Sequence, residues 1–327
     1  MRFELVHCHG SGNDFPLIDA RTIALADADW AGVARALADR SGPVGGDGLL
    51  LLTAGDERHP FGMRMFNSDG SEAETCLNGL RCVARAGFEA LGLERAEVKL
   101  KTSTVSTVRD APIAPGVWTV KETAGPATLD VRAWPMDAGA ERFVDTPIAP
   151  LGSERTFTAV AIPNPHLVGF VERVDEAELV RLGERCEAAP DWLPNRANVS
   201  FVEVRAAASG RVGPGRGGPD TIFVRTFERG VGLTNSCGSA MAASTYAAGL
   251  TGRVPFGTVT TVLNAGGLVR AVAGEDGTVS LSGNATWEWA GSVEVNAGAG
   301  RAGDLRIERR FEEEVAAWDA VTRAARD

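Results

Sequence analysis

Short runs of alternating hydrophobic and polar residues cover most of the chain, a pattern typical of strands with one buried face. These runs are rich in Val, Thr, Ile and Phe, which favour strands. We therefore expect a fold dominated by short strands. The expected strands include Val98–Val108, Thr156–Ile162, Asn198–Val204, Thr221–Phe227 and Val259–Leu263.

Four segments instead repeat apolar residues at helical spacing. Two of them, Trp30–Arg40 and Glu176–Glu187, combine apolar and charged residues and predict amphipathic helices. The other two follow Cys76 and Cys237, and the run Ala240–Leu250 carries no charge on any side. A helix that is apolar all round is typically buried. We therefore expect the helix after Cys237 to lie inside a core.

Two further segments differ from this pattern. Residues 206–220 are rich in glycine, proline and arginine, which predicts a flexible hairpin or loop between two strands. The tail at residues 304–327 is highly charged, and we expect it to form a surface helix added after the core. Four of its apolar residues follow helical spacing: Ile307, Phe311, Val315 and Trp318.

One short pattern occurs twice, at positions separated by about half the chain. Arg64 is followed twelve positions later by Cys76, and Arg225 is followed twelve positions later by Cys237. Each copy reads as a strand, a loop, a hydroxyl residue, the cysteine and a helix. Repetition at this distance predicts two related halves. A helix wrapped by antiparallel strands in each half is the simplest α+β arrangement.

Length and charge narrow the class of protein. The chain has 327 residues, a net charge of −10 and no apolar stretch long enough to span a bilayer, so we expect two domains and no membrane partner. The N-terminus lacks the apolar segment of a signal peptide, which favours a cytoplasmic protein. Acidic net charge without a basic patch argues against a nucleic-acid partner.

The cysteines and lysines argue against several cofactors. Five cysteines without Cys-x-x-Cys spacing predict free thiols in a reducing compartment, rather than disulfides or a zinc cluster. The lysines are Lys99, Lys101 and Lys121, and the first two lie in a strand-like run, so pyridoxal phosphate has few candidates for a Schiff base. We predict no cofactor and no metal.

A position at a helix start makes Cys76 and Cys237 candidates for proton transfer. Free cysteines are most often small buried hydrophobes, and we interpret Cys8, Cys82 and Cys186 in that way. At a helix start, unpaired N–H groups and the helix dipole lower the pKa of a thiol and bind carboxylates. Two such thiols on opposite sides of an amino-acid α-carbon would remove and return its proton, which inverts the centre.

Around these cysteines the sequence resembles the diaminopimelate epimerase family. The resemblance extends over residues 1–296 and rests on motifs that stand in the family's order. They are His9–Phe15 (HGSGNDF), Phe66–Glu74 (FNSDGSEAE) with Cys76–Arg81 (CLNGLR), Asn164-Pro-His166, Asn198-Val199, and Glu228–Gly232 (ERGVG) with Cys237-Gly238.

The fold implied by this resemblance is α+β with two pseudo-repeated halves, each a mostly antiparallel, barrel-like sheet around a central buried helix. In the family fold the last strand returns to the first half. We therefore expect a first half at residues 1–126 with a returning strand at 285–296, a second half at 127–284, and a C-terminal helical extension at 297–327. The sequence leaves open whether the protein forms a homodimer.

The resemblance also implies a reaction. Cys76 and Cys237 match the acid/base pair that interconverts LL- and meso-diaminopimelate without a cofactor. The substrate is then a small amino acid, whose reacting carboxylate would bind N–H groups at the two helix starts. The residues that carry those groups are Leu77, Asn78, Gly238 and Ser239.

Further positions match substrate-binding residues of the family. Glu228 matches the carboxylate that holds the reacting amino group, and Arg229 would meet the distal carboxylate, which suits a guanidinium fork. His166 matches a histidine near the cysteines. The other matches are Asn13, Asn67, Asn164 and Asn198. Purely structural roles are open for each. Asparagines in turns commonly bond their own backbone, Glu228 and Arg229 could form a surface ion pair, and His166 could be a core histidine.

Three positions depart from the family's pattern. Leu77 stands in place of a glycine, Gly48 in place of a glutamine and Leu233 in place of a glutamate. These changes favour an alternative, a racemase or epimerase of the same fold that acts on a different amino acid, whereas Arg229 opposes it. A catalytically inactive binding protein would not need two thiols. A metal site of Cys76, Cys237 and His166 is the weakest alternative.

Overall fold

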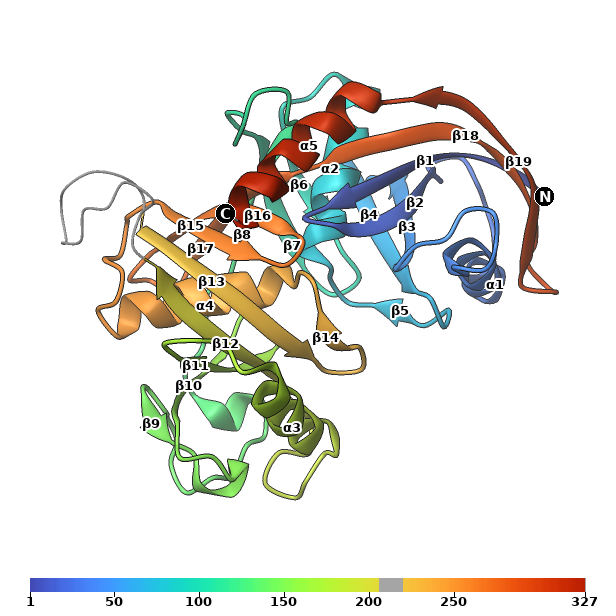
Figure 1. Cartoon of the computed structure of the whole chain (residues 1–327). Coiled ribbons are helices and arrows are strands. Elements are labelled where there is room, and N and C mark those ends of the chain that lie inside the picture. Colours follow the sequence, from blue (N-terminus) through green and yellow to red (C-terminus); the bar gives the residue numbers. More distant parts are fainter. Residues whose placement is uncertain (206–219, 327) are drawn as a thin grey trace. The chain divides into compact units, whose positions relative to one another are not determined.

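The computed structural model describes residues 1–205 and 220–326 (Figure 1). The expected loop at 206–220 therefore lies, except for its last residue, outside the described residues. The fold is mixed α/β, mostly sheet, with five α-helices in the described part of the chain. The chain forms two compact units: unit 1 comprises Met1–Glu122 and Ser282–Asp327, and unit 2 comprises Thr123–Leu281.

Unit 1 contains both ends of the chain. The chain passes from unit 1 to unit 2 within β8 and returns within β17. The helices of unit 1 are α1 (Asp27–Ala38), α2 (Leu77–Leu91) and α5 (Glu312–Arg326). The strands are β1 (Arg2–Gly10), β2 (Asn13–Asp19), β3 (Gly48–Ala54), β4 (Phe61–Asn67), β5 (Glu72–Ala73), β6 (Arg95–Lys99), β7 (Thr104–Arg109), β8 (Thr119–Ala124), β17 (Val279–Asn284), β18 (Thr286–Asn296) and β19 (Arg301–Arg310).

Unit 2 contains two α-helices, α3 (Glu176–Glu187) and α4 (Gly238–Leu250), and two short 3₁₀ helices at Val131–Ala133 and Ala149–Leu151. Its strands are β9 (Thr146–Pro147), β10 (Thr156–Ala161), β11 (Pro165–Phe170), β12 (Asn198–Arg205), β13 (Asp220–Glu228), β14 (Gly232–Thr234), β15 (Thr260–Asn264) and β16 (Gly267–Ala273).

The sheet of each unit is mixed. In unit 1, β1–β2, β3–β4 and β6–β7 pair antiparallel, whereas β2–β3 and β4–β6 pair parallel. In unit 2, β10–β11, β12–β13 and β15–β16 pair antiparallel, whereas β11–β12 and β13–β15 pair parallel. Pairings therefore alternate in the same order in both units.

We expected a mostly antiparallel sheet in each half, and the helices explain why each sheet also contains parallel pairs. Parallel neighbours need a long crossover connection, and a helix commonly supplies it. In unit 1, α1 connects β2 to β3 and α2 lies between β4 and β6; in unit 2, α3 connects β11 to β12 and α4 lies between β13 and β15. Each of the four helices that the sequence predicted therefore lies in the crossover connection between two parallel strands.

The two helices that follow the cysteines are buried. α2 contacts β1, β2, β3, β4 and β6, and α4 contacts β10, β11, β12, β13 and β16. From Gly238 to Ala248 every residue of α4 is buried, which confirms the prediction from its uncharged sequence. α2 differs because two of its buried residues are Arg81 and Arg85. Such residues are seldom buried without partners, so both must be paired inside unit 1.

Two predicted elements are wrong in part. Val98–Val108 is not one strand, because Leu100 N–H donates to Ser103 O (2.8 Å) in a turn that separates β6 from β7. The expected helical tail begins instead with a strand, since β19 pairs antiparallel with β18 at the edge of the sheet (Figure 1). Only α5, which starts at Glu312, is helical.

Helix α5 is anchored to unit 1 by a charged contact and an aromatic one. Both carboxylate oxygens of Glu314 accept hydrogen bonds from Arg85 of α2, at 2.5 and 2.8 Å. The Arg85 guanidinium also lies 4.3 Å from the ring centroid of Trp287. Trp318 is buried, and its ring centroid lies 5.7 Å from that of His9 on β1.

We predict that Glu314→Ala lowers the free energy of unfolding by about 2 kcal/mol, because it leaves the buried Arg85 without its bidentate partner. Urea denaturation measures this change. Glu313→Ala, an exposed substitution on the same turn, serves as the matched control and is expected to change the free energy by less than about 0.5 kcal/mol. Equal effects of the two substitutions would contradict the anchoring role of Glu314.

Candidate active site

Cys76 is the N-cap of α2. Its backbone is extended (φ −149°, ψ 102°), and its Sγ accepts a hydrogen bond from Gly79 N–H at 3.4 Å. A Cβ at position 79 would lie 2.7 Å from Leu50 Cδ2, so glycine allows the first turn to pack against β3. The thiol is therefore held at a helix start, where N–H groups without an intrahelical acceptor cluster.

Two predicted asparagines lie beside Cys76. Asn13 Oδ1 is 3.9 Å from Cys76 Sγ and 3.5 Å from the Nδ2 donor of Asn78. Leu77 is the first residue of α2 and is buried. Asn67 is different, because its side chain donates to Ser71 Oγ (2.9 Å) in the turn after β4. The structure thus joins Asn13 and Asn78 to the thiol but ties Asn67 to its own turn.

Cys237 is the N-cap of α4 in unit 2 and has the same extended backbone as Cys76. Its backbone is extended (φ −130°, ψ 114°), its side chain is buried, and its Sγ lies 3.4 Å from Ser239 Oγ. Gly238 and Ser239 begin the helix. Both cysteines that the sequence singled out are therefore the residues that start a buried helix.

The remaining predicted residues of unit 2 form a polar cluster. His166 and Asn198 are register partners on parallel strands β11 and β12, and both are fully buried. His166 Nε2 lies 3.3 Å from Asn164 Oδ1. Asn198 Oδ1 accepts the backbone N–H of Arg229 at 2.9 Å, at the end of β13. Glu228 is the last residue of that strand, directly before Arg229.

Two donors or acceptors in this cluster have no hydrogen-bond partner among residues 1–205 and 220–326. They are the buried Nδ1 of His166 and the buried Nδ2 of Asn198. Burial, and secondarily the charge of Arg229, lower the pKa of His166 to about 3. The imidazole is therefore neutral at physiological pH. A buried polar atom without a partner costs free energy that a bound ligand can recover.

The other cysteines lie in the cores. Cys8, Cys82 and Cys186 are fully buried. Burial raises the pKa of the Cys186 thiol to about 12 and raises the pKa of Cys8 well above its ordinary value. These two thiols therefore stay protonated near neutral pH, which suits the interpretation of them as small hydrophobes.

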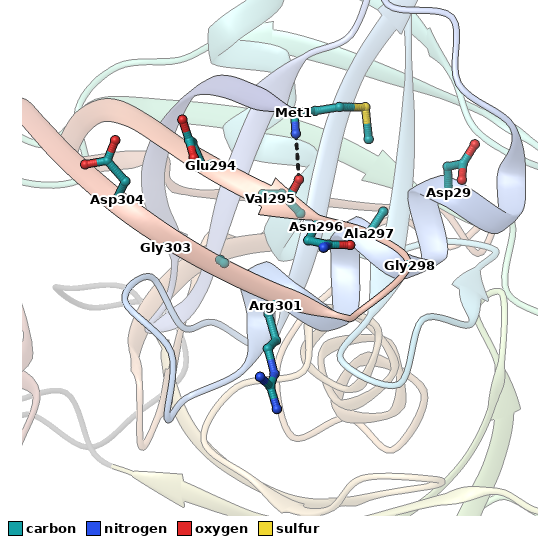
Figure 2. Close-up of a pocket in the computed structure, with 11 residues that line it drawn as sticks. Met1, Asp29, Glu294, Val295, Asn296, Ala297, Gly298, Arg301, Gly303 and Asp304 are labelled. Carbon is teal, nitrogen blue, oxygen red and sulfur yellow. Dashed lines mark hydrogen bonds between the residues drawn. The ribbon is translucent and has the colours of Figure 1, made fainter.

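A hollow of about 610 Å³ lies at the β18–β19 hairpin (Figure 2). Met1 lines this hollow, and its terminal amino group donates a hydrogen bond to Val295 O at 2.7 Å. Asp29, Arg301 and Asp304 are charged residues of the lining. None of its lining residues is a predicted site residue, so we do not assign it to the active site. Within residues 1–205 and 220–326 no group of three or more potential metal ligands converges, and no helix could span a bilayer.

A family model described as diaminopimelate epimerase matches residues 5–111 and 158–288 of this chain. A relative named diaminopimelate epimerase, from Clostridium acetobutylicum, is 36% identical over 302 residues, which are 90% of this chain and 87% of that relative. The chain belongs to the diaminopimelate epimerase family. Both cysteines lie within the matched segments.

Solved structures similar to this member of the diaminopimelate epimerase family support the fold. A PhzF-family phenazine biosynthesis protein from Bacillus anthracis has a TM-score of 0.61 and 13% identity, covering 90% of this chain and 100% of that one. A hydroxyproline epimerase from Agrobacterium vitis has a TM-score of 0.59 and 15% identity, covering 90% and 92%. At these identities the likeness concerns the fold alone.

The structure gives physical reasons for two departures from the diaminopimelate epimerase pattern. A Cβ at Gly48 would lie 2.3 Å from Phe66 O, so the approach of β3 to β4 leaves no space for a side chain. Leu233 packs against the hydrophobic core that contains Phe227 and Leu182, so its isobutyl group has a structural role. Neither substitution requires a different arrangement of Cys76 and Cys237 from that of the family.

Three residues that bear on the site had no predicted role, although two of them, Ser11 and Arg81, lie within the quoted motifs. Ser11, Arg81 and Asn284 are fully buried and connected by hydrogen bonds next to Asn78. A signal existed for Arg81, since it is a charge on a helix with mostly apolar neighbours. Asn284 had none, because it lies 273 positions from its partner Ser11.

We predict a pH-dependent stability contribution from His166. The folded protein keeps this imidazole neutral, whereas the unfolded chain binds a proton below its ordinary pKa of 6.5. The free energy of unfolding is therefore not reduced by His166 above pH 6.5, and it decreases as the pH falls below that value because the unfolded chain binds the proton. Between about pH 7 and about pH 5 the wild type should lose about 2 kcal/mol more than His166→Gln. Urea denaturation at both pH values tests this, and parallel losses would contradict it.

Proposed function

We propose that this protein interconverts LL- and meso-diaminopimelate by proton transfer between Cys76 and Cys237, without a cofactor. The observation that carries the proposal is that both cysteines are the N-cap residues of buried helices, in a chain whose relatives are named diaminopimelate epimerase. As an amino-acid epimerase it is an isomerase.

The chemistry follows from the helix starts. One cysteine, as thiolate, accepts the α-proton, and the electron pair of the broken C–H bond remains on the substrate as a carbanion. The opposite thiol then donates its proton to the other face of the carbon and becomes the thiolate. N–H groups at both helix starts would bind the α-carboxylate and stabilise the charge that spreads onto it.

The polar cluster of unit 2 supports substrate binding. His166 and Asn198 keep unpaired buried atoms, which substrate groups would satisfy. In the proposal Glu228 holds the reacting amino group and Arg229 holds the distal carboxylate, with further polar contacts from Asn13, Asn67, Asn78, Asn164 and Ser239. The neutral His166 binds rather than exchanges protons, because its pKa lies near 3.

The finer features of the fold belong to this proposal. The same alternation of strand pairings and the same cysteine-helix step in units 1 and 2 support two pseudo-repeated halves that arose by duplication. Curling of each sheet around α2 or α4 into a barrel stays a prediction. So do the expected domain bounds, the cytoplasmic location, the absence of a nucleic-acid partner and the homodimer.

A racemase for another amino acid is the second candidate, and Leu77 is the observation that favours it, since its side chain replaces a glycine next to the first thiol. Exchange of substrate α-hydrogen with deuterated water, measured across diaminopimelate and monocarboxylic amino acids, separates the candidates. Exchange only in a monocarboxylic amino acid would reject diaminopimelate and leave the two-cysteine mechanism in place.

We predict that Cys76→Ala and Cys237→Ala each abolish inversion, because each removes the proton donor or acceptor on one face of the carbon. Stereoisomer-resolved turnover of diaminopimelate is the measurement. Cys186→Ala, which alters a buried thiol of the unit 2 core, is the matched control and should retain turnover. Near-wild-type inversion by either alanine variant of the two helix-start cysteines would reject the mechanism.

We predict that Arg229→Lys lowers kcat/KM for diaminopimelate about 10- to 100-fold, equivalent to ~1.5–3 kcal/mol for a charge-assisted hydrogen bond. Lysine keeps the charge but loses the planar fork that pairs with a carboxylate. Kinetics on diaminopimelate and on a monocarboxylic amino acid, with both proteins, give the result. An equal effect on both substrates would contradict a contact with the distal carboxylate.

A further inference from the structure

Arg81 is a fully buried arginine in the second turn of α2, five residues after Cys76. Burying a guanidinium is costly unless hydrogen bonds replace its water. Here four hydrogen bonds do so, and each goes to a different segment of unit 1. The acceptors are Ser11 Oγ (3.1 Å), Asn78 Oδ1 (2.8 Å), Glu122 Oε1 (2.8 Å) and Asn284 O (3.1 Å).

Two of these acceptors, Asn78 and Ser11, belong to the segments that flank the proposed catalytic thiol and its neighbour Asn13. Asn78 is in the first turn of α2 and donates to Asn13 Oδ1, the atom that also lies near Cys76 Sγ. Ser11 is in the tight β1–β2 turn that leads to Asn13, and it adopts a left-handed backbone (φ 53°). Through Nη2, Arg81 therefore joins the helix start to the turn that carries Asn13.

The β1–β2 turn approaches α2 very closely. A Cβ at Gly10 would lie 2.4 Å from Asn78 O and 3.1 Å from Arg81 Nη2. Such contact leaves the turn little freedom as long as the arginine stays in place.

The other two acceptors tie Arg81 to the strands through which the chain enters and leaves unit 1. Glu122 lies on β8 and Asn284 ends β17. Asn284 also accepts Ser11 N–H at 2.7 Å through its side chain. Burial raises the pKa of Glu122 to about 7, and both the charge and the hydrogen bond of Arg81 oppose this shift. In α4 the residue five positions after Cys237 is Ala242, so this helix carries no arginine at the corresponding position.

We propose that Arg81 is a positioning residue, whose planar fork holds the Cys76 helix start and the Asn13 turn in one fixed arrangement. The proposal deepens the proposed function and rests on it for the role of Cys76. Lysine cannot replace this arginine, because a single ammonium group cannot reach four acceptors spread around a plane.

The test compares two thiols of the same molecule. Each protein is treated with iodoacetamide at neutral pH without substrate, and peptide mass spectrometry gives separate alkylation rates for Cys76 and Cys237. In Arg81→Lys the Cys76 rate should fall about fivefold, because the thiolate loses its aligned N–H groups. Cys237 should keep its rate, and kcat/KM should fall on the order of tenfold.

Arg85→Lys is the matched control. It alters a buried arginine one turn further along α2, whose partners are Glu89, Glu314 and Ala285 O. We expect it to lower the free energy of unfolding and to leave the Cys76 rate unchanged. If Arg81→Lys fails to fold, Ser11→Ala, which removes one acceptor, should slow Cys76 about twofold.

Two results would overturn the proposal. One is an unchanged alkylation rate of Cys76 in Arg81→Lys, or in Ser11→Ala if only that variant folds. The other is an equal change in the alkylation rates of Cys76 and Cys237. Failure of the proposed function would look different. Wild-type protein would then exchange no substrate α-hydrogen, while the ratio of the two alkylation rates, which needs no substrate, would still respond to Arg81.

Discussion

The start of a buried helix imposes the constraint on which both units depend. Such a start carries N–H groups without intrahelical acceptors, and leaving them buried and unpaired costs free energy. At α2 the Cys76 sulfur accepts one of them, from Gly79. The strands on either side of each helix are then paired in parallel, because the helix is their crossover. The buried helix thus accounts for the parallel pairing of its flanking strands, and its start holds N–H groups without intrahelical acceptors.

The local pattern of polar and apolar residues predicted the helices and strands better than it predicted which strands pair and in which direction. The bounds of α3 agree with the predicted Glu176–Glu187, and the uncharged sequence of α4 predicted its complete burial. Alternation of polar and apolar residues reports that one face of a strand is buried, but it carries no information on the direction of the neighbouring strand. That is why the parallel pairs were missed. In the tail, helical spacing at Ile307 was overridden by pairing of β19 with β18.

In the candidate site, too, the sequence predicted some features and not others. The motifs placed Cys76 and Cys237 at helix starts, but the hydrogen bonds that join Asn13 to Cys76 and to Asn78 span 63 and 65 positions. The contacts that hold this arrangement are distant in sequence: Arg81 and Glu122 lie 41 positions apart, and Ser11 and Asn284 lie 273 apart. No periodicity of the chain encodes such contacts. Pairing of His166 with Asn198 likewise depends on the register of two strands.

The last strand has a consequence for how unit 1 meets other molecules. β19 lies beside β18 (Figure 1). It is largely exposed, its register with β18 is interrupted by two irregularities, and it carries Arg301, Arg306, Arg309 and Arg310. An open sheet edge is a template for pairing with another chain, and charged side chains and bulges are the means by which natural sheets discourage it. The tail therefore covers β18 with an edge that resists aggregation, which protects the sheet that supports the Cys76 helix.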